Sequence, residues 1–222
     1  MVSSLNHEKA IQEIERAFEN WNSGEKIENK AVEEKNQEIK EITIKKNIEQ
    51  NTIVYLYTFH DLDKDLELPL RILNHRLGES SNSLLFREVR EKRGLAYDIY
   101  TSIDMTNNVK TLYIYTAVGE EDVEAAVEAI DETINGVKEG TLEIGDKDLE
   151  LMKKVHKTAV ISTLEDPSEL SNYMLHQGLD KEDFYEFEKD MEKLDTLDIG
   201  KIQKVAREVL NNPTIHILKS RK

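Results

Sequence analysis

Apolar residues recur every three to four positions along much of the chain, which is the spacing of one face of an α-helix. This pattern predicts helices over residues 5–21, 65–77, 84–93, 120–137, 146–163, 168–178, 181–193 and 197–210. Elsewhere, β-branched and aromatic residues dominate or alternate with polar ones, which is typical of strands. Strands are therefore predicted over residues 38–46, 52–59, 96–105, 109–118 and 214–218.

The order of these elements predicts the fold class. After helix 5–21, two strands are followed by helices, a second strand pair around Asn107-Asn108, more helices and a last strand. Asn tolerates positive φ, so this pair has the character of a hairpin turn. Hairpins mixed with helices, without regular βα alternation, predict an α+β fold with a largely antiparallel sheet packed with helices.

Small residues mark several predicted helix ends. Ser3 or Ser4 could serve as the N-cap of the first helix, because a hydroxyl accepts a hydrogen bond from the first turn. Gly78 is a plausible C-cap of helix 65–77, and Thr196 is expected to start the last helix.

Apolar periodicity stops between Gly24 and Lys35, where Glu, Lys and Asn dominate. Such a composition is typical of a solvated linker. The sequence therefore predicts a separate unit over residues 1–24, a linker over residues 25–35 and an α+β domain over residues 36–222.

Composition excludes several classes of function. The chain has 222 residues, 38% hydrophobic residues and a net charge of -15, so it can bury a core but repels nucleic acid and anionic membranes. It has no apolar run of 18 residues and no apolar signal core in its first ten, so a cytoplasmic location is expected. It has no cysteine, which excludes disulfides, thiolate zinc sites and cysteine nucleophiles.

No metal site or cofactor site is expected in this chain. The six histidines are His7, His60, His75, His156, His176 and His216. None forms H-E-x-x-H or the inverse H-x-x-E-H, and although His75 and Glu79 could share a helix face, Gly78 interrupts it. The sequence also lacks G-x-S-x-G, a Walker loop and G-x-G-x-x-G.

One segment combines groups that could carry chemistry. Residues 80–97 hold a polar turn, a short amphipathic helix, Gly94 and then Tyr97 entering a strand. The guanidinium of Arg90 suits recognition of a carbonyl or carboxylate, and a phenol can donate to a developing oxyanion. The plainer interpretation is that the charges solvate a helix and that Tyr97 is an amphipathic strand residue.

Residues 84–97 (LLFREVREKRGLAY) are similar to the signature of the pitrilysin/insulysin metallopeptidase family. That family includes the mitochondrial processing peptidases and many bacterial processing proteases. Residues 73–78, 117–119 and 166–178 also resemble family segments, and the resemblance covers about residues 36–218.

The resemblance implies a half-domain of the LuxS/mitochondrial-processing-peptidase-like type. Two homologous α+β halves of such an enzyme close around extended peptides, and zinc is bound only by the half that carries H-x-x-E-H. The other half contributes an Arg and a Tyr seven residues apart, which match Arg90 and Tyr97. The resemblance therefore assigns Arg90 to binding a substrate carbonyl and Tyr97 to oxyanion stabilisation in trans, and it places zinc in a missing catalytic half.

This chain would then be the substrate-binding half of a hydrolase, inactive by itself. Residues 1–24 would be the last short strand (residues 2–4) and helix of a preceding half. The catalytic half could lie on the same chain or on a separate subunit. Alternatively, the chain could come from a parent protein whose first half has lost its zinc site. An apolar patch on the face that meets the partner would favour a homodimer of the isolated domain. Two alternatives stay open: a non-catalytic structural subunit of the same fold family, and an unrelated acidic α+β binding protein.

Overall fold

The computed structural model describes residues 2–22, 24, 32–105, 109–142 and 144–221. Its sheet has five strands in the order β1-β5-β2-β4-β3. Their bounds are β1 Lys40–Lys46, β2 Asn51–Thr58, β3 Ala96–Asp104, β4 Thr111–Val118 and β5 Thr214–Arg221. Three of the four strand pairings are antiparallel and only β1–β5 is parallel, which confirms the predicted α+β fold. The predicted Asn107-Asn108 turn lies outside the described residues.

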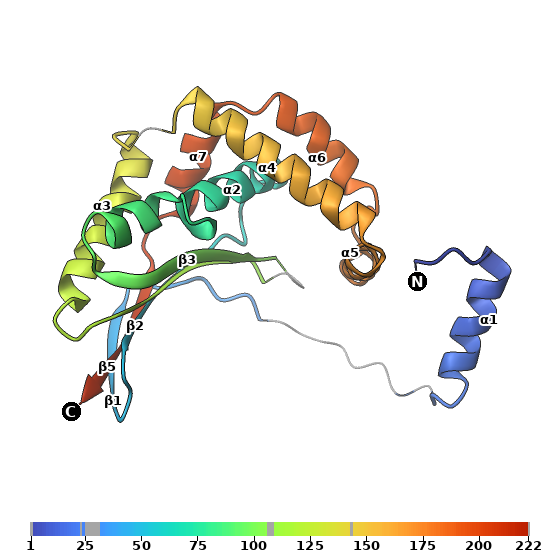
Figure 1. The fold of residues 1–222 in the computed structure, drawn as a ribbon, viewed down its shortest axis with the longest axis horizontal. Coiled ribbons are helices and arrows are strands. Elements are labelled where there is room, and N and C mark those ends of the chain that lie inside the picture. Colours follow the sequence, from blue (N-terminus) through green and yellow to red (C-terminus); the bar gives the residue numbers. More distant parts are fainter. Residues whose placement is uncertain (1, 23, 25–31, 106–108, 143, 222) are drawn as a thin grey trace.

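The helices that belong to this domain lie over one face of the sheet (Figure 1). The helix bounds are α1 His7–Phe18, α2 Glu67–Asn74, α3 Val123–Glu139, α4 Asp146–Glu165, α5 Pro167–Asp180, α6 Glu186–Asp195 and α7 Ile199–Val209. Two π-helical segments, His75–Glu79 and Phe86–Glu91, follow α2. The predicted helices are thus present, although the one expected at 181–193 begins only at Glu186.

The core forms between this sheet face and the helices. Along β2, Ile53, Tyr55 and Tyr57 are buried, while the residues between them are half-buried on the opposite face. The phenol of Tyr55 donates a hydrogen bond to Asp131 Oδ1 on α3 (2.9 Å), which satisfies a polar group inside the core. Strict alternation therefore assigns one face of the sheet to the core and leaves the other open.

An amide and a carboxylate side chain, not hydroxyls, cap α1 and α7. Asn6 caps α1, because its Oδ1 accepts from the backbone N–H of Lys9 at 3.0 Å. The prediction of Ser3 or Ser4 was wrong, and residues 2–4 form no strand. Thr196 was also the wrong N-cap, since it ends α6, and Asp198 caps α7 through a bond from the N–H of Lys201 at 2.9 Å.

Gly78 is not a C-cap. It lies inside the π-helical segment that continues α2 to Glu79, and it is buried. A Cβ at this position would lie 2.5 Å from Cγ2 and 2.8 Å from the backbone N of Thr101 on β3. The absence of a side chain therefore allows helix and sheet to approach closely.

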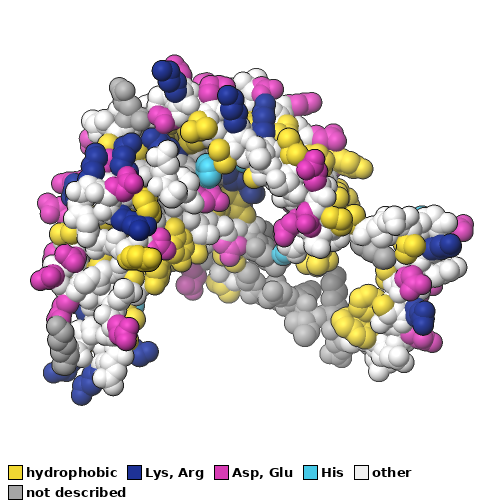
Figure 2. Space-filling model, in the orientation of Figure 1, with side chains coloured by type: hydrophobic (Ala, Val, Ile, Leu, Met, Phe, Trp, Pro, Cys, Tyr) yellow, Lys and Arg dark blue, Asp and Glu magenta, His cyan; other side chains and the backbone are white. Residues whose placement is uncertain are grey.

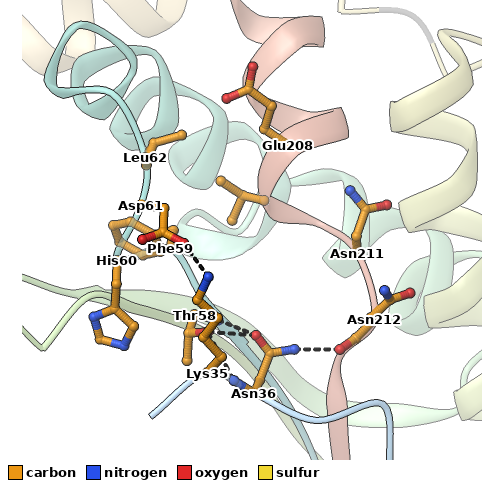
Figure 3. A pocket seen from close by; sticks show the side chains of 11 residues that line it. Lys35, Asn36, Thr58, Phe59, His60, Asp61, Leu62, Glu208, Asn211 and Asn212 are labelled. Carbon is orange, nitrogen blue, oxygen red and sulfur yellow. Dashed lines mark hydrogen bonds and ion pairs between the residues drawn. The ribbon is translucent and has the colours of Figure 1, made fainter. Parts of the chain in front are cut away.

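The chain enters the sheet domain through a polar clasp at Asn36. The amide oxygen of Asn36 accepts from the backbone N–H and the hydroxyl of Thr58, and its Nδ2 donates to the carbonyl of Asn212 (Figure 3). The pocket around this clasp includes Lys35, which pairs with Asp61. Because these groups bond to one another, we interpret this pocket as a structural junction between β2 and the approach to β5.

Helix α1 has no buried residue, and Figure 1 shows it standing apart from the sheet domain. Its apolar side chains remain exposed, as Figure 2 shows, and they include Ile11, Ile14 and Phe18. No helix in the described ranges is long and apolar enough to cross a membrane. The division at residues 24 and 36 stays a prediction.

Candidate functional site

The structure brings Arg90 and Tyr97 together at the start of β3. The Arg90 Cζ atom lies 5.1 Å from the centroid of the Tyr97 ring and 4.4 Å from that of Phe86. A guanidinium stacked between two aromatic faces is held by cation–π attraction, which leaves its edge N–H groups directed away from the rings. The predicted pair is thus one local constellation.

Local backbone geometry creates this arrangement. The N–H of Gly94 bonds to the carbonyl of Arg90 at 3.0 Å, and the N–H of Leu95 bonds to that of Val89 at 3.1 Å, which closes the helical segment. Gly94 has a φ of 66°, which glycine adopts without the penalty that a side chain would add. The chain can therefore reverse and enter β3 directly.

Tyr97 is the extra residue of a β-bulge. Ala96 pairs with Val118 and Asp98 pairs with Ala117, so Tyr97 has no partner on β4. A bulge re-aims its side chain, and the Tyr97 side chain is 80% exposed. A large aromatic residue that is held out from a sheet in this way is available to a ligand or a partner.

Charged residues near Arg90 form ion pairs, whereas Arg90 forms none among the described residues. Glu88 is buried and accepts hydrogen bonds from Lys92 Nζ (2.8 Å) and Arg87 Nε (3.1 Å). Arg93 pairs with Glu132 on α3. Within the part of the chain that the structure describes, no carboxylate pairs with Arg90. Arg90 is held by the rings of Phe86 and Tyr97 instead of by an ion pair, and both its assignment to a ligand and the solvated-helix interpretation stay predictions.

Burial alone would raise the pKa of Glu88, but hydrogen bonds and charge from Lys92 and Arg87 outweigh it and hold the pKa below its usual range. A carboxylate with a lowered folded-state pKa stabilises the fold above its unfolded pKa of about 4.3, and this stabilisation is lost as pH falls through the folded value.

We expect Glu88→Gln to lower the free energy of unfolding by about 1 kcal/mol at pH 7, because the charge-assisted bonds weaken while their partly exposed partners regain water. Urea denaturation at pH 7 and pH 3 checks this. The gap between the two proteins should shrink at the lower pH, and an equal gap at both would contradict the assignment.

Among the residues that the structure describes, no group of three or more His, Asp or Glu side chains is placed to hold a metal ion. Gly78 does not break the helical path, so His75 Nδ1 reaches Glu79 Oε2 at 3.4 Å, contrary to the sequence interpretation. This pair lines a cavity that sequence reasoning missed, because its walls come from three distant segments.

The fold and the chain's sequence define its class. A family model described as "Peptidase M16 inactive domain" matches residues 1–155. The chain belongs to this family, which confirms the resemblance inferred from residues 84–97 and the prediction of an inactive half-domain of such a peptidase.

Particular relatives agree with this assignment. "Uncharacterized zinc protease YmxG" of Bacillus subtilis is 28% identical over 155 residues, which cover 70% of this chain and 37% of that protein. "Uncharacterized zinc protease ML0855" of Mycobacterium leprae is 25% identical over 142 residues, which cover 64% of this chain and 32% of that protein.

Solved structures share the fold. A protease from Helicobacter pylori superposes with a TM-score of 0.83 at 20% identity, over 97% of this chain and 53% of that one. The peptidase M16 inactive domain from Pseudomonas fluorescens gives a TM-score of 0.73 at 19% identity, over 99% of this chain and 51% of that one. The chain thus spans about a third of these curated relatives and half of these solved chains.

Proposed function

We propose that this chain is the substrate-binding, non-zinc half of a zinc endopeptidase that hydrolyses extended peptides, and that it is inactive without a zinc-bearing homologous half. The observation that carries the proposal is the pair of a half-buried Arg90 and an exposed Tyr97, which the bulge and the two aromatic stacks hold in place without an ion-pair partner on Arg90 among the described residues. A purely structural half would need neither an unpaired guanidinium nor an outward phenol.

The two side chains would act on the same peptide bond. The N–H groups of Arg90 would bind a substrate carbonyl, and the Tyr97 hydroxyl would donate to the oxyanion that develops when water adds to the scissile carbonyl. Donors that are already positioned at a developing charge lower the barrier because they need no reorganisation.

The open face of the sheet supports a partner in this role. On the three central strands, the open-face positions hold no Asp, Glu, Lys or Arg in a protein of net charge -15: Thr52, Val54, Leu56, Thr58, Thr111, Tyr113, Tyr115, Ala117, Thr214, His216, Leu218 and Ser220. Tyr100 on β3 extends this surface, with its ring centroid 5.2 Å from that of Tyr115. Depletion of charge with aromatic enrichment is typical of an interface centre, so we assign this face to the other half or to a second copy.

Reconstitution tests the proposal. The chain is mixed with a zinc-bearing half taken from its own gene or operon, and hydrolysis of an internally quenched peptide is followed. We expect hydrolysis only when both parts are present, with loss of activity on chelation. The chain alone should bind no stoichiometric zinc.

Arg90→Gln should raise KM by about tenfold, because one charge-assisted bond to the substrate is lost. Full activity of the zinc-bearing half alone, or an Arg90→Gln variant with unchanged kinetics, would instead favour a structural subunit.

A further inference from the structure

The edge of the sheet at β1 is uncovered along its whole length. β1 is the last strand of the described sheet on its side, and all seven of its residues are exposed. Among the described elements, its extensive contacts are with β5 alone, so no helix packs closely over it. Ile42 and Ile44 are therefore 51% and 62% exposed, although Ile42 pairs in the parallel register with the buried Ile217. The core-side face of the sheet thus continues onto β1 as an uncovered apolar ledge.

The free backbone groups of this edge belong to alternate residues. The N–H of Ile215 on β5 bonds to the carbonyl of Ile39 at 2.7 Å, so the odd-numbered residues of this segment face β5. Ile42 and Ile44 lie between them and direct their N–H and C=O groups away from β5, to the outer edge. Thr43 directs its own groups toward β5. An edge of this kind pairs with another strand unless it is guarded, often by Lys.

The sequence of β1, KEITIKK, is self-complementary in one antiparallel register. With Thr43 opposite Thr43 of a second copy, Ile42 lies opposite Ile44 twice and Glu41 lies opposite Lys45 twice. Apolar pairs and opposite charges across two strands stabilise them, whereas like charges directly opposite destabilise them. A pair centred on Glu41 or Lys45 would oppose like charges, and one centred on Ile42 or Ile44 would place the other Ile opposite a Lys.

The backbone geometry agrees with this register. Ile42 and Ile44 form hydrogen-bonded pairs that use the free N–H and C=O groups of the outer edge. Thr43, Glu41 and Lys45 then occupy non-hydrogen-bonded pairs, in which the Cα atoms approach to about 4.5 Å and the side chains are closest. The ion pairs between copies therefore fall at the positions where side chains meet best.

The Lys residues that guard this edge against an unrelated strand are accommodated by a second copy. Lys45 meets Glu41 of the other copy on the open face of the sheet. Lys40 and Lys46 lie opposite each other on the core side, where the Glu124 carboxylate of α3 interacts with Lys40 and offsets part of their repulsion. The charges of β1 thus favour a second copy of this chain over an unrelated strand.

We propose that two copies of this chain associate by antiparallel pairing of their β1 strands about Thr43, so that one sheet runs through both copies. The two-fold axis of such a pair is perpendicular to the sheet, which places both helix layers on one side and leaves both open faces free on the other. A seven-residue strand pair is a small interface, so we expect a dissociation constant of about 10–100 µM. The inference goes beyond the proposed function and does not depend on Arg90 or Tyr97.

Exchange of charges tests the register. Sedimentation velocity of the 222-residue chain between about 1 µM and 1 mM should show a reversible monomer–dimer equilibrium. Glu41→Lys and Lys45→Glu should each weaken the dimer about tenfold, because each places like charges opposite one another twice. The double variant Glu41→Lys/Lys45→Glu restores opposite charges and should recover the affinity of the unmodified chain.

Single cysteines test the geometry, because the chain has no cysteine of its own. Thr43→Cys should form a disulfide-linked dimer on oxidation with diamide, since its two copies lie within disulfide reach. Glu41→Cys and Lys45→Cys should cross-link when they are mixed but not separately. Thr158→Cys, at an exposed position on α4, is the control for collisional cross-linking.

A chain that stays monomeric throughout this range, a double variant as weak as the single ones, or Thr43→Cys cross-linking no faster than Thr158→Cys would each overturn the inference. Suppression of the Thr43→Cys cross-link by the zinc-bearing half would assign the edge to that half and overturn it as well. Hydrolysis by the reconstituted pair and its dependence on Arg90 and Tyr97 are measured separately, so failure of this inference is distinguishable from failure of the proposed function.

Discussion

Replacing Tyr97 by phenylalanine should reduce peptide hydrolysis by the reconstituted pair by about 10²–10³-fold, which is the usual cost of removing one oxyanion donor. The substitution deletes only the hydroxyl. The ring remains, so the stacking of Arg90 at 5.1 Å should persist, and an 80% exposed side chain contributes little to the core. The loss should therefore appear in catalysis and not in stability.

The distribution of this loss between kinetic constants is diagnostic. A donor that acts only on the developing oxyanion lowers kcat and kcat/KM together and leaves KM almost unchanged. Tyr185→Phe is the matched control, since Tyr185 is also exposed (60%) but lies at the start of α6. If Tyr97→Phe behaved like this control, Tyr97 would be only a surface residue, and the structural-subunit alternative would be preferred.

Local elements could be predicted from the sequence, but the strand order could not. The β-branched and aromatic content of residues 52–59 predicted β2, whereas its buried face of Ile53, Tyr55 and Tyr57 is known only from the structure. This content could not show that β5 inserts between β1 and β2, or that β1 runs parallel to β5. Periodicity is a property of neighbouring residues, whereas strand order depends on packing between segments that are far apart in sequence.

The same limit applies to the candidate site. The resemblance located Arg90 and Tyr97 and their spacing, but their contact depends on the turn at Gly94 and on a bulge fixed by the register with β4. The cavity beside Asn74 could not be predicted, because its walls converge only after α4 packs near α2. The neutralisation of Arg93 likewise needs α3 to bring Glu132 within reach.

The contact between the π-helical segment His75–Glu79 and β3 should be highly sensitive to a small added group. We expect Gly78→Ala to lower the free energy of unfolding by about 2 kcal/mol. A methyl group there would lie 2.5 Å from Cγ2, 2.7 Å from Oγ1 and 2.8 Å from the backbone N of Thr101. Overpacking of this kind costs about 1–3 kcal/mol and occasionally more, while replacing a helical glycine by alanine returns roughly 0.5–1 kcal/mol.

The contact with the backbone N of Thr101 decides whether Gly78→Ala stabilises or destabilises the fold. A side chain can rotate away, but the backbone of Thr101 is held by pairing with Ile114 on β4, so the strand cannot yield without breaking the sheet. Urea denaturation measures the loss, with Gly24→Ala as the control, because a Cβ at Gly24 meets no atom within 4 Å. Adding Thr101→Ala to Gly78→Ala should restore only part of the stability, since it removes the two side-chain contacts and leaves the backbone one. Unchanged stability of Gly78→Ala would mean that the π-helical segment moves freely against β3, and close packing would then not explain the glycine.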